Sequence, residues 1–272
     1  MKVLVTGSEG FIGKPTCKLL EENGHEVIPF DLEVGRDLEV PSHFEGLEYD
    51  SVIHLAAVSS TPWARDCPRR AFTTNVFGTY ILLCDCVMKK AKRFVYASSY
   101  RVKDLPVDNP YVVSKKLEEE VVNIFRTWTD ITGLRYTSVY GPEGPLKTHS
   151  VNILNQIIES AMRCTEVIIH GDGTQFRDFV YVDDVARANL EALLADKTGT
   201  FDIGSGSGTS LREAIRAVET LSGKKVNAKY IAKYPSDYMM SQAAESLVTK
   251  CNIGFVTQVD LPEGIRRCIA SY

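Results

Sequence analysis

The sequence predicts an α/β protein in which a doubly wound parallel sheet is followed by a smaller, mixed α/β lobe. Three observations predict this fold. Short runs rich in β-branched residues alternate with helical stretches, a glycine-rich turn joins the first strand to the first helix, and the alternation weakens beyond residue 145. We therefore expect one domain at 1–145 and a lobe at 146–272, with the chain returning to the first domain around 178–200.

Length and composition fit a globular protein of this kind. The 272 residues correspond to about two domains at the usual ~150 residues each. The chain is 44% hydrophobic and 24% charged, which excludes disordered, collagen-like and coiled-coil chains. Its 31 Lys and Arg against 35 Asp and Glu give a net charge of −4, which argues against a nucleic-acid-binding protein.

The expected elements follow one another in βαβ order. The expected strands span residues 3–5, 26–30, 51–55, 93–97 and 134–139. The expected helices, in which apolar residues recur at every third or fourth position, span residues 12–22, 70–90 and 112–128. Because helices separate consecutive strands, the sheet is expected to be parallel. A run of helix breakers from Gly141 to Pro145 marks the expected domain border.

Membrane and metal partners are not expected. No stretch reaches the ~18 consecutive apolar residues of a membrane span, and the N-terminal apolar run is too short for a signal peptide, so we expect a cytoplasmic protein. The seven cysteines are odd in number and lack CxxC spacing. Free buried thiols are therefore favoured over metal ligands, and no metal site is expected.

A glycine-rich turn follows the first expected strand and opens the first helix. In this context Gly7 permits a tight turn, Gly10 lets a pyrophosphate approach the backbone, and Gly13 lets the helix pack closely on the strand. The N-terminus of the helix offers free N–H groups and a positive dipole end to phosphate. The turn therefore predicts a dinucleotide site. Its expected contacts are Gly7, Gly10, Phe11, Ile12 and Gly13.

Asp31 ends the second expected strand, where a carboxylate can accept hydrogen bonds from both hydroxyls of an adenine ribose. The same charge repels a 2′-phosphate, so NAD is favoured over NADP. Arg36, in the following loop, would neutralise such a phosphate, and NADP stays open as the alternative. A loop-capping aspartate is the structural alternative for Asp31.

Tyr111 and Lys115 are one turn apart at the start of an expected helix, so their side chains share a face. An ammonium beside a phenol lowers the phenol pKa from ~10 towards neutrality, which makes the tyrosine a usable proton carrier. Such a pair often arises by chance. Ser98 and Ser99 strengthen the interpretation because they end an expected strand at the carboxyl edge of the sheet, where ligands of open α/β sheets bind.

These segments together resemble the extended short-chain dehydrogenase/reductases, and within them the sugar-nucleotide epimerases and dehydratases. The resemblance extends over nearly the whole chain. The motifs that carry it are Thr6-Gly7-x-x-Gly10-Phe11-Ile12-Gly13, His54-Leu55-Ala56-Ala57, Asn75-Val76-x-Gly78-Thr79, Ser98-Ser99, Tyr111-x-x-x-Lys115, Tyr140-Gly141-Pro142, Gly171-Asp172-Gly173, Arg177 to Val185, Ile203 to Gly206 and Leu261 to Ile265. The resemblance implies a Rossmann-type fold, NAD as cofactor, a nucleotide-sugar substrate and a homodimer.

The resemblance also implies roles for single residues. Ser99 would hold the sugar hydroxyl or carbonyl, Tyr111 would move its proton, and Lys115 would bind the nicotinamide ribose. Cofactor contacts implied beyond the glycine-rich turn and Asp31 are Asp37, Leu38, Leu55, Ala56, Ala57, Asn75, Tyr111 and Lys115. Substrate contacts implied are Ser99, Tyr100, Ser138 and Arg177. Among these, Arg177 would grip the nucleotide diphosphate, because a guanidinium offers paired donors to phosphate oxygens.

One departure from the family bears on the reaction. Tyr100 and Arg101 follow Ser99, where dehydratases of the family carry an Asp-Glu pair, so dehydration is not expected. The expected reaction is epimerisation of a nucleotide sugar at C4, of the UDP-glucose/UDP-galactose type, through a transient 4-keto intermediate. Two alternatives stay open. They are a nucleotide-sugar 4-ketoreductase or dehydrogenase with net cofactor turnover, and a non-enzymatic NAD-binding regulator.

Two apolar stripes on the expected helices fit the homodimer that the resemblance implies. One stripe comprises Phe72, Val76, Tyr80 and Leu83, and the other comprises Val113, Leu117, Val121 and Phe125. Either stripe would also suit a helix that faces the sheet, so the dimer rests mainly on the resemblance.

Overall fold

The computed structural model describes residues 1–103, 109–142, 152–235 and 238–272. Its centre is a six-stranded sheet in the order β10-β5-β4-β3-β1-β2, in which all neighbouring strands are parallel. The strands are β1 (Lys2–Thr6), β2 (Glu26–Phe30), β3 (Ser51–His54), β4 (Arg93–Ser99), β5 (Asp130–Tyr136) and β10 (Gly199–Ile203). The predicted Rossmann-type parallel sheet is confirmed.

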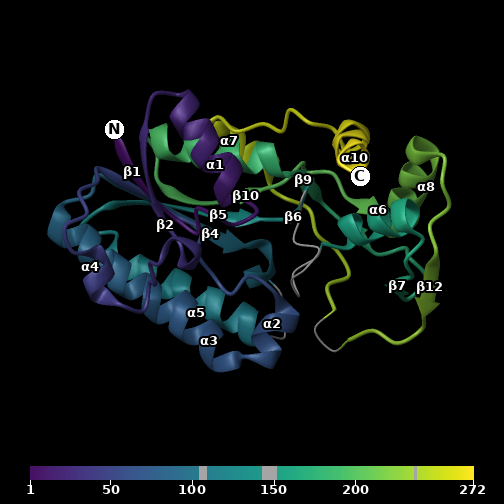
Figure 1. The fold of residues 1–272 in the computed structure, drawn as a ribbon, viewed down its shortest axis with the longest axis horizontal. Helices are drawn as coiled ribbons and strands as arrows, with labels where there is room; N and C mark the ends of the chain where they lie inside the picture. The colour runs from purple at the N-terminus through teal and green to yellow at the C-terminus, as the bar shows by residue number, and fades with distance from the viewer. Residues whose placement is uncertain (104–108, 143–151, 236–237) are drawn as a thin grey trace.

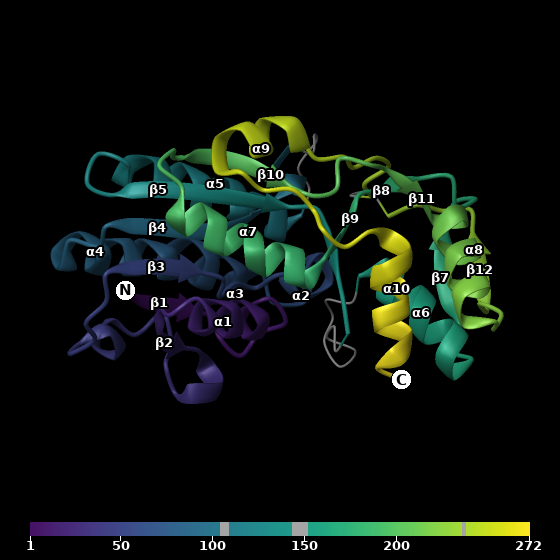
Figure 2. The same ribbon diagram turned by 90° about the horizontal axis from the view of Figure 1, so that it is seen from above.

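Helices cover both faces of this sheet (Figures 1 and 2). Helices α1 (Gly13–Glu22) and α7 (Val182–Leu194) pack on one face, and α3 (Pro68–Phe72), α4 (Thr79–Lys89) and α5 (Pro110–Phe125) cover the other. Side chains alternate along each strand, so Val3 and Val5 enter the core beneath α7, whereas Leu4 enters the core beneath α4. The sheet is therefore buried on both sides, as a doubly wound fold requires.

The helix expected at 112–128 spans Pro110–Phe125, and two other predicted elements differ in kind from those observed. The helix expected at 70–90 is a continuous helical run from Pro68 to Lys89 whose middle, Thr73–Gly78, is π-helical (η3). The strand expected at 134–139 is divided into β5 and β6 (Ser138–Tyr140). The division occurs because pairing changes partner: Thr137 donates its N–H to the carbonyl of Ile203, whereas the N–H of Ser138 donates to Asp178.

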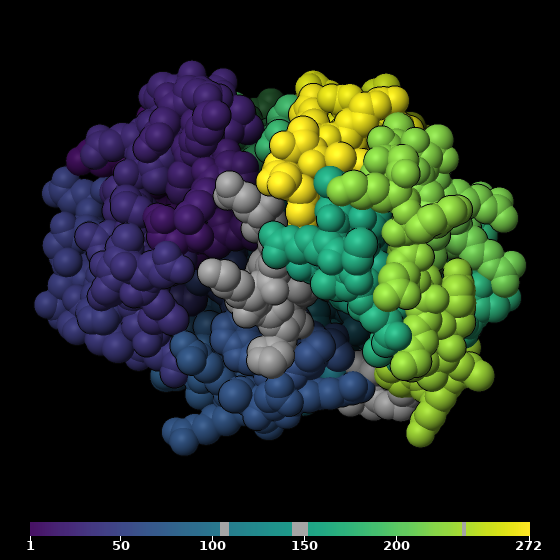
Figure 3. All heavy atoms as spheres, turned by 45° about the vertical axis from the view of Figure 1, so that its right-hand side comes forward, coloured from purple at the N-terminus to yellow at the C-terminus, as the bar shows by residue number. Residues whose placement is uncertain are grey.

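A second core holds together what we call the C-terminal lobe, the elements to the right of the sheet in Figure 1. These elements are β6, α6 (Ile153–Arg163), β7 (Val167–His170), β8 (Phe176–Arg177), β9 (Phe179–Tyr181), β11 (Thr209–Ser210), α8 (Leu211–Ser222), β12 (Ala228–Ile231) and α10 (Leu261–Ala270). Its strands form three two-stranded sheets. Figure 3 shows the main sheet domain in purple and blue on one side and this lobe in green and yellow on the other.

The chain crosses between the two parts several times. After β9 it enters α7 on the main sheet and then β10 at the sheet edge, before β11 and α8 return to the lobe. Helix α9 (Ser246–Ile253) packs on β10. The border predicted at residue 145 lies outside the described residues, so the division into 1–145 and 146–272 stays a prediction.

The cysteines and the apolar helices qualify two expectations. All seven cysteines are free, but Cys67, Cys164 and Cys251 are exposed, because each lies at or near the end of a helix rather than within its packed face. The expectation of buried thiols is therefore wrong for these three.

One helical run in the described part of the chain resembles a membrane span. The run Pro68–Lys89 is long enough to cross a membrane and contains an 18-residue stretch with a mean hydropathy of 1.3, and 44% of that stretch is buried inside the fold. Among the same residues no cluster of potential metal ligands is found.

Candidate active site

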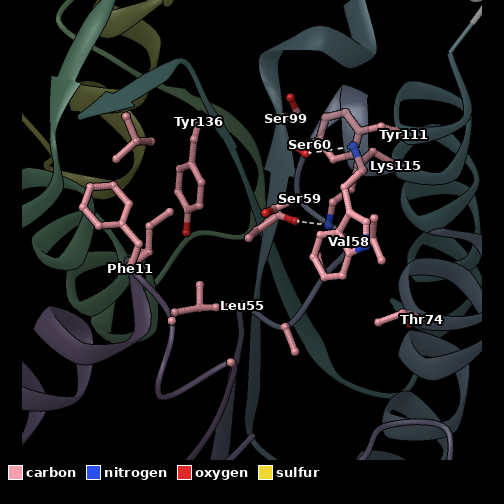
Figure 4. Close-up of a pocket in the computed structure, with 18 of the residues that line it drawn as sticks. Phe11, Leu55, Val58, Ser59, Ser60, Thr74, Ser99, Tyr111, Lys115 and Tyr136 are labelled. Carbon is pink, nitrogen blue, oxygen red and sulfur yellow. Dashed lines mark hydrogen bonds between the residues drawn. The ribbon is translucent and has the colours of Figure 1, made fainter. Parts of the chain in front are cut away.

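A cavity of about 850 Å³ lies at the carboxyl edge of the six-stranded sheet, facing the C-terminal lobe. Its size falls in the usual range of ~300–1,000 Å³ for small-molecule sites. The sheet domain contributes the glycine-rich turn, the residues that follow β2, β3 and β4, and the first turns of α5. The lobe contributes polar side chains from β6, α6 and the segment before α9. Figure 4 shows part of this lining.

The glycine-rich turn is closed too tightly for side chains at two of its positions. Gly7 has a φ of +70°, and a Cβ there would lie 2.7 Å from the backbone N of Ala56. A Cβ on Gly13 would collide with the carbonyl oxygen of Gly7. The turn is further fixed by a 3.0 Å hydrogen bond from the N–H of Gly10 to that same oxygen. This cradle at a helix N-terminus fits the diphosphate of a dinucleotide.

Asp31 closes the end of the cavity next to β2. Its Oδ1 accepts a hydrogen bond from the N–H of Glu33 at 3.0 Å, and its Oδ2 accepts one from Glu9 at 3.2 Å. The loop-capping role that was the alternative for this residue is therefore present, and the side chain lines the cavity as well. Arg36 donates to the carbonyl of Pro29 at 2.7 Å, so part of its guanidinium is engaged with backbone. Asp37 and Leu38 also line this end.

The residues that follow β3 form one wall of the cavity, and hydrogen bonds with the side chains of Thr6 and Asn75 fix their backbone. Thr6 accepts hydrogen bonds through Oγ1 from the N–H groups of Leu55 and Ala56, which with Ala57 line the cavity. Asn75 holds the next residue, Val58, from both sides: its Oδ1 accepts from the N–H at 2.8 Å and its Nδ2 donates to the carbonyl at 3.1 Å. Asn75 is fully buried and is not among the lining residues. It positions the wall rather than forming its surface.

The three expected catalytic side chains line the same part of the cavity (Figure 4). Ser99 ends β4, while Tyr111 and Lys115 project from the first turns of α5. This helix begins there because Asn109 caps it, accepting a hydrogen bond from the N–H of Tyr111 at 2.8 Å, and because Pro110 suits the first helical position. The local sequence of α5 therefore brings the phenol and the ammonium to the strand end that carries the hydroxyl.

Lys115 is held by groups on the protein side of the cavity. Its side chain is 4% exposed, and Nζ donates to the carbonyl of Ala97 at 3.0 Å. The ammonium also lies 2.7 Å from Oε2 of Glu118. Tyr111 and Trp63 both pack against a small buried cluster of Val58, Ala64 and Ala71.

The four expected substrate contacts do not all reach the cavity. Ser99 and Ser138 line it, and Ser138 donates through Oγ to Oε1 of Gln242 at 2.7 Å. Tyr100 lies in a 3-10 turn after β4 that directs Arg101, rather than Tyr100, to the lining. Arg177 also lies outside the lining of the described residues.

The position of Arg177 follows from its strand. Strand β8 pairs with β11, and the Arg177 guanidinium lies 5.2 Å from the centre of the Tyr238 ring and donates to the carbonyl of Phe176 at 2.8 Å. The side chain is therefore packed within the lobe, with the residue 8% exposed.

Several lining residues were not anticipated. Trp63 and Arg70 stand on one side, with the Arg70 guanidinium 5.8 Å from the Trp63 ring centre. Arg101 donates to Oγ1 of Thr61 at 2.6 Å. Gln242 comes from the opposite lobe. No pattern of spacing marks these residues in the sequence, because they meet only through the packing of α2 (Thr61–Asp66), α3 and the lobe.

Comparison with known proteins agrees with this geometry. Residues 3–204 match the NAD-dependent epimerase/dehydratase family. A Methanocaldococcus jannaschii protein named "Putative UDP-glucose 4-epimerase" is 32% identical over 98% of this chain and 97% of its own length. The UDP-glucose 4-epimerase of Bacillus subtilis is 27% identical over 87% of each chain.

Solved structures give the same result. A Thermotoga maritima UDP-glucose 4-epimerase with UDP-glucose is 28% identical with a TM-score of 0.91, covering 100% of this chain and 98% of that one. A Thermus thermophilus UDP-glucose 4-epimerase in complex with NAD is 26% identical with a TM-score of 0.89, at the same coverage. The protein described here belongs to the NAD-dependent epimerase/dehydratase family, and NAD is its cofactor.

Proposed function

We propose that the protein interconverts the C4 epimers of a UDP-linked hexose, of the UDP-glucose/UDP-galactose type, through a transient 4-keto sugar. The observation that carries this proposal is the gathering of Ser99, Tyr111 and Lys115 in one cavity with a diphosphate cradle and Asp31. Relatives named UDP-glucose 4-epimerase, and a structural neighbour that holds UDP-glucose, support the choice of reaction.

The proton transfer is assigned to side chains at the end of β4 and the start of α5. Tyr111, as phenolate, takes the proton of the sugar C4 hydroxyl, and Ser99 shares the hydrogen bond to that oxygen. Lys115 stabilises the phenolate through its positive charge. NAD, when bound, would supply the hydride acceptor for C4 and the hydride donor for the opposite face of the sugar. Tyr111 then gives the proton back, so the sugar leaves inverted and no net proton is consumed.

The cofactor contacts belong to the same proposal. Gly7, Gly10 and Gly13 would receive the diphosphate, and Asp31 the adenine ribose. Phe11, Ile12, Asp37, Leu38, Leu55, Ala56 and Ala57 would line the remaining length of the cofactor site. Asn75 would act on the cofactor through Val58, whose N–H and carbonyl it holds.

The substrate side is assigned to the C-terminal lobe. Ser138 and Gln242 line the cavity opposite the sheet domain and would contact the nucleotide part of the substrate. Arg177 would grip the diphosphate after its side chain turns away from Tyr238, with which it makes a cation–π contact. Anchoring by the nucleotide leaves the sugar free to present either face, which inversion at C4 requires.

The test is an assay of the full chain with NAD and UDP-glucose, followed by chromatographic separation of the sugars. We expect conversion in both directions with no lasting absorbance of reduced nicotinamide. Tyr111→Phe should lower the rate by about 10³-fold, as expected for loss of a general base. Tyr100→Phe, which alters a neighbouring tyrosine outside the cavity lining, is the matched control and should keep the rate.

Other results of these assays would favour one of the alternatives or overturn the proposal. Stoichiometric accumulation of reduced nicotinamide would replace the epimerase by the ketoreductase or dehydrogenase alternative. Absence of conversion for UDP-, dTDP- and GDP-sugars alike would overturn the proposal. A regulator that only binds NAD would keep its biological output in the Tyr111→Phe variant.

We also propose that the protein is a cytoplasmic homodimer that associates through α4 and α5. The outer face around these helices exposes Phe77 on η3, Tyr80 on α4, Leu117 and Ile124 on α5, and Trp128 just after α5. Aromatic contacts cross this face, including Tyr80 with Phe125 at 6.0 Å between ring centres. Leu83 from the predicted stripe instead faces the sheet and is fully buried. Sedimentation should give a dimer, and the Tyr80→Glu variant a monomer.

A further inference from the structure

Behind the catalytic corner of the cavity lies a fully buried carboxyl group. Glu118 stands on α5, one turn beyond Lys115, and its side chain is 1% exposed. The ammonium of Lys115 lies 2.7 Å from Oε2. On the other side, Oε1 lies 3.8 Å from Nε2 of His54 on β3. Among the described residues, Lys115 and His54 are the basic side chains within ion-pair distance of this carboxyl group.

His54 cannot supply a second positive charge. Thr79 donates its hydroxyl proton to the carbonyl of Asn75 at 2.7 Å, so its oxygen must accept the hydrogen of Nε2, which lies 2.9 Å away. Nδ1 then carries no proton and accepts from the hydroxyl of Thr6 at 2.6 Å. Burial, and then the charge of Lys115, lower the pKa of His54 to about 3. The imidazole is therefore neutral wherever the enzyme works.

Other groups around Glu118 come from its own helix and three neighbouring elements. The titratable or polar side chains that face it are Lys115 and Glu119 on α5, His54 on β3, Tyr96 on β4 and Thr79 on α4. Burial raises the pKa of Glu118 to about 7, a rise that Lys115 limits and Glu119 increases. Both forms of the carboxyl are therefore populated near neutral pH.

We propose that Glu118 is a positioning residue that sets how much of the Lys115 charge acts on the Tyr111 phenol. Ionised, it neutralises the ammonium and draws it back, which weakens the attraction between the ammonium and a Tyr111 phenolate; protonated, it leaves the ammonium for the phenolate. This inference rests on the proposed function, because it concerns the same proton transfer. Lys115 has the geometry for this control, since Glu118 and the carbonyl of Ala97 both hold its Nζ.

The decisive variant is Glu118→Gln, which keeps the shape of the side chain and removes its charge. In the pH profile of kcat/KM for UDP-glucose, the limb at low pH should move down by about one unit, because Tyr111 stays ionised to lower pH. Glu118→Asp keeps the charge but withdraws it by one methylene, so its limb should move in the same direction by less. Glu120→Gln, exposed on the same helix, is the matched control and should leave the profile unchanged.

A second measurement separates this inference from the proposed function. The phenolate of Tyr111 is titrated by ultraviolet difference absorbance, with the Tyr111→Phe chain as blank, and this needs no turnover. If UDP-sugars are not converted but the Tyr111 titration still moves to lower pH in Glu118→Gln, the proposed function fails and the inference stands. If the titration and the pH profile stay in place in both Glu118 variants, Glu118 is only structural and the inference is overturned. Should Glu118→Gln not fold, the Glu118→Asp titration decides by the same criterion.

Discussion

The two sides of the cavity are built from different parts of the chain in different ways. In the proposed assignment, the sheet domain would meet the cofactor through a glycine-rich turn and residues at the ends of neighbouring parallel strands. The C-terminal lobe would meet the substrate with polar side chains such as Gln242, carried by two-stranded sheets and connecting segments. Backbone positions are fixed by strand register, whereas side-chain positions depend on how the lobe packs. We therefore expect cofactor binding to be rigidly specified and sugar choice to be adjustable.

The largest effect is expected from adding one methyl group to the glycine-rich turn that forms the diphosphate cradle. A Cβ in Gly13→Ala would collide with the carbonyl oxygen of Gly7, which must move to relieve the contact. We expect the Kd for NAD to rise by about 100-fold, or roughly 2.7 kcal/mol, measured by calorimetry. Gly208→Ala, at the start of the lobe's β11 with only ordinary contacts to Phe176, is the control and should bind NAD normally. Unchanged affinity in Gly13→Ala would show that the cradle is not the diphosphate site.

A smaller effect is expected at the ribose end. In Asp31→Ala the carboxylate that is proposed to accept from the ribose hydroxyls is lost, and so is its repulsion of a 2′-phosphate. The Kd for NAD should rise by about 30-fold, while that for NADP should change little or fall, so the preference for NAD narrows. Titration with both dinucleotides measures the ratio. An unchanged ratio would mean that Asp31 only caps its own loop, where it accepts the N–H of Glu33.

On the substrate side, Arg177→Lys should act on the sugar nucleotide alone. Lysine keeps the charge but loses the paired donors, so KM for UDP-glucose should rise by about 10-fold with the Kd for NAD unchanged. Steady-state kinetics and NAD titration on the same preparation separate the two effects. A lower melting temperature with an unchanged KM would instead assign Arg177 to packing against Tyr238.

The last prediction concerns stability and pH, and it does not involve ligand binding. Burial raises the pKa of Glu118 from 4.5 to about 7, so between these values the folded state holds a proton that the unfolded state lacks. Its contribution to the free energy of unfolding therefore falls as pH rises from 4.5 to 7. In Glu118→Gln this loss is absent. Between pH 4.5 and 7, the melting temperature of the variant should rise relative to that of the parent chain by a few degrees. A difference in melting temperature that stays constant with pH would contradict the raised pKa.

Local patterns in the sequence predicted the sheet domain well. The glycine-rich turn, Asp31 and the Tyr111–Lys115 pair depend on neighbours within one strand or one helical turn, and all of them line the cavity. The division of the strand at Thr137 could not be predicted, because it follows from a change of pairing partner from β10 to β9.

The remaining site residues depend on contacts distant in sequence. Glu118 was not anticipated, since a carboxyl beside other acidic residues on a helix ordinarily suggests a solvated face, and only packing against His54 shows it to be buried. Tyr100 and Arg177 were expected at the substrate, but a 3-10 turn and the pairing of β8 direct their side chains away from the cavity lining.

The π-helical segment Thr73–Gly78 makes the cavity wall sensitive to a change of a single codon. A π turn contains one residue more than the α-helical turn it replaces, and each residue of an α-helix advances the side chains by about 100°. Deleting one residue between Asn75 and α4 would restore a regular helix and rotate the amide of Asn75 away from Val58. Gene alignments should therefore show no insertions or deletions between Asn75 and α4.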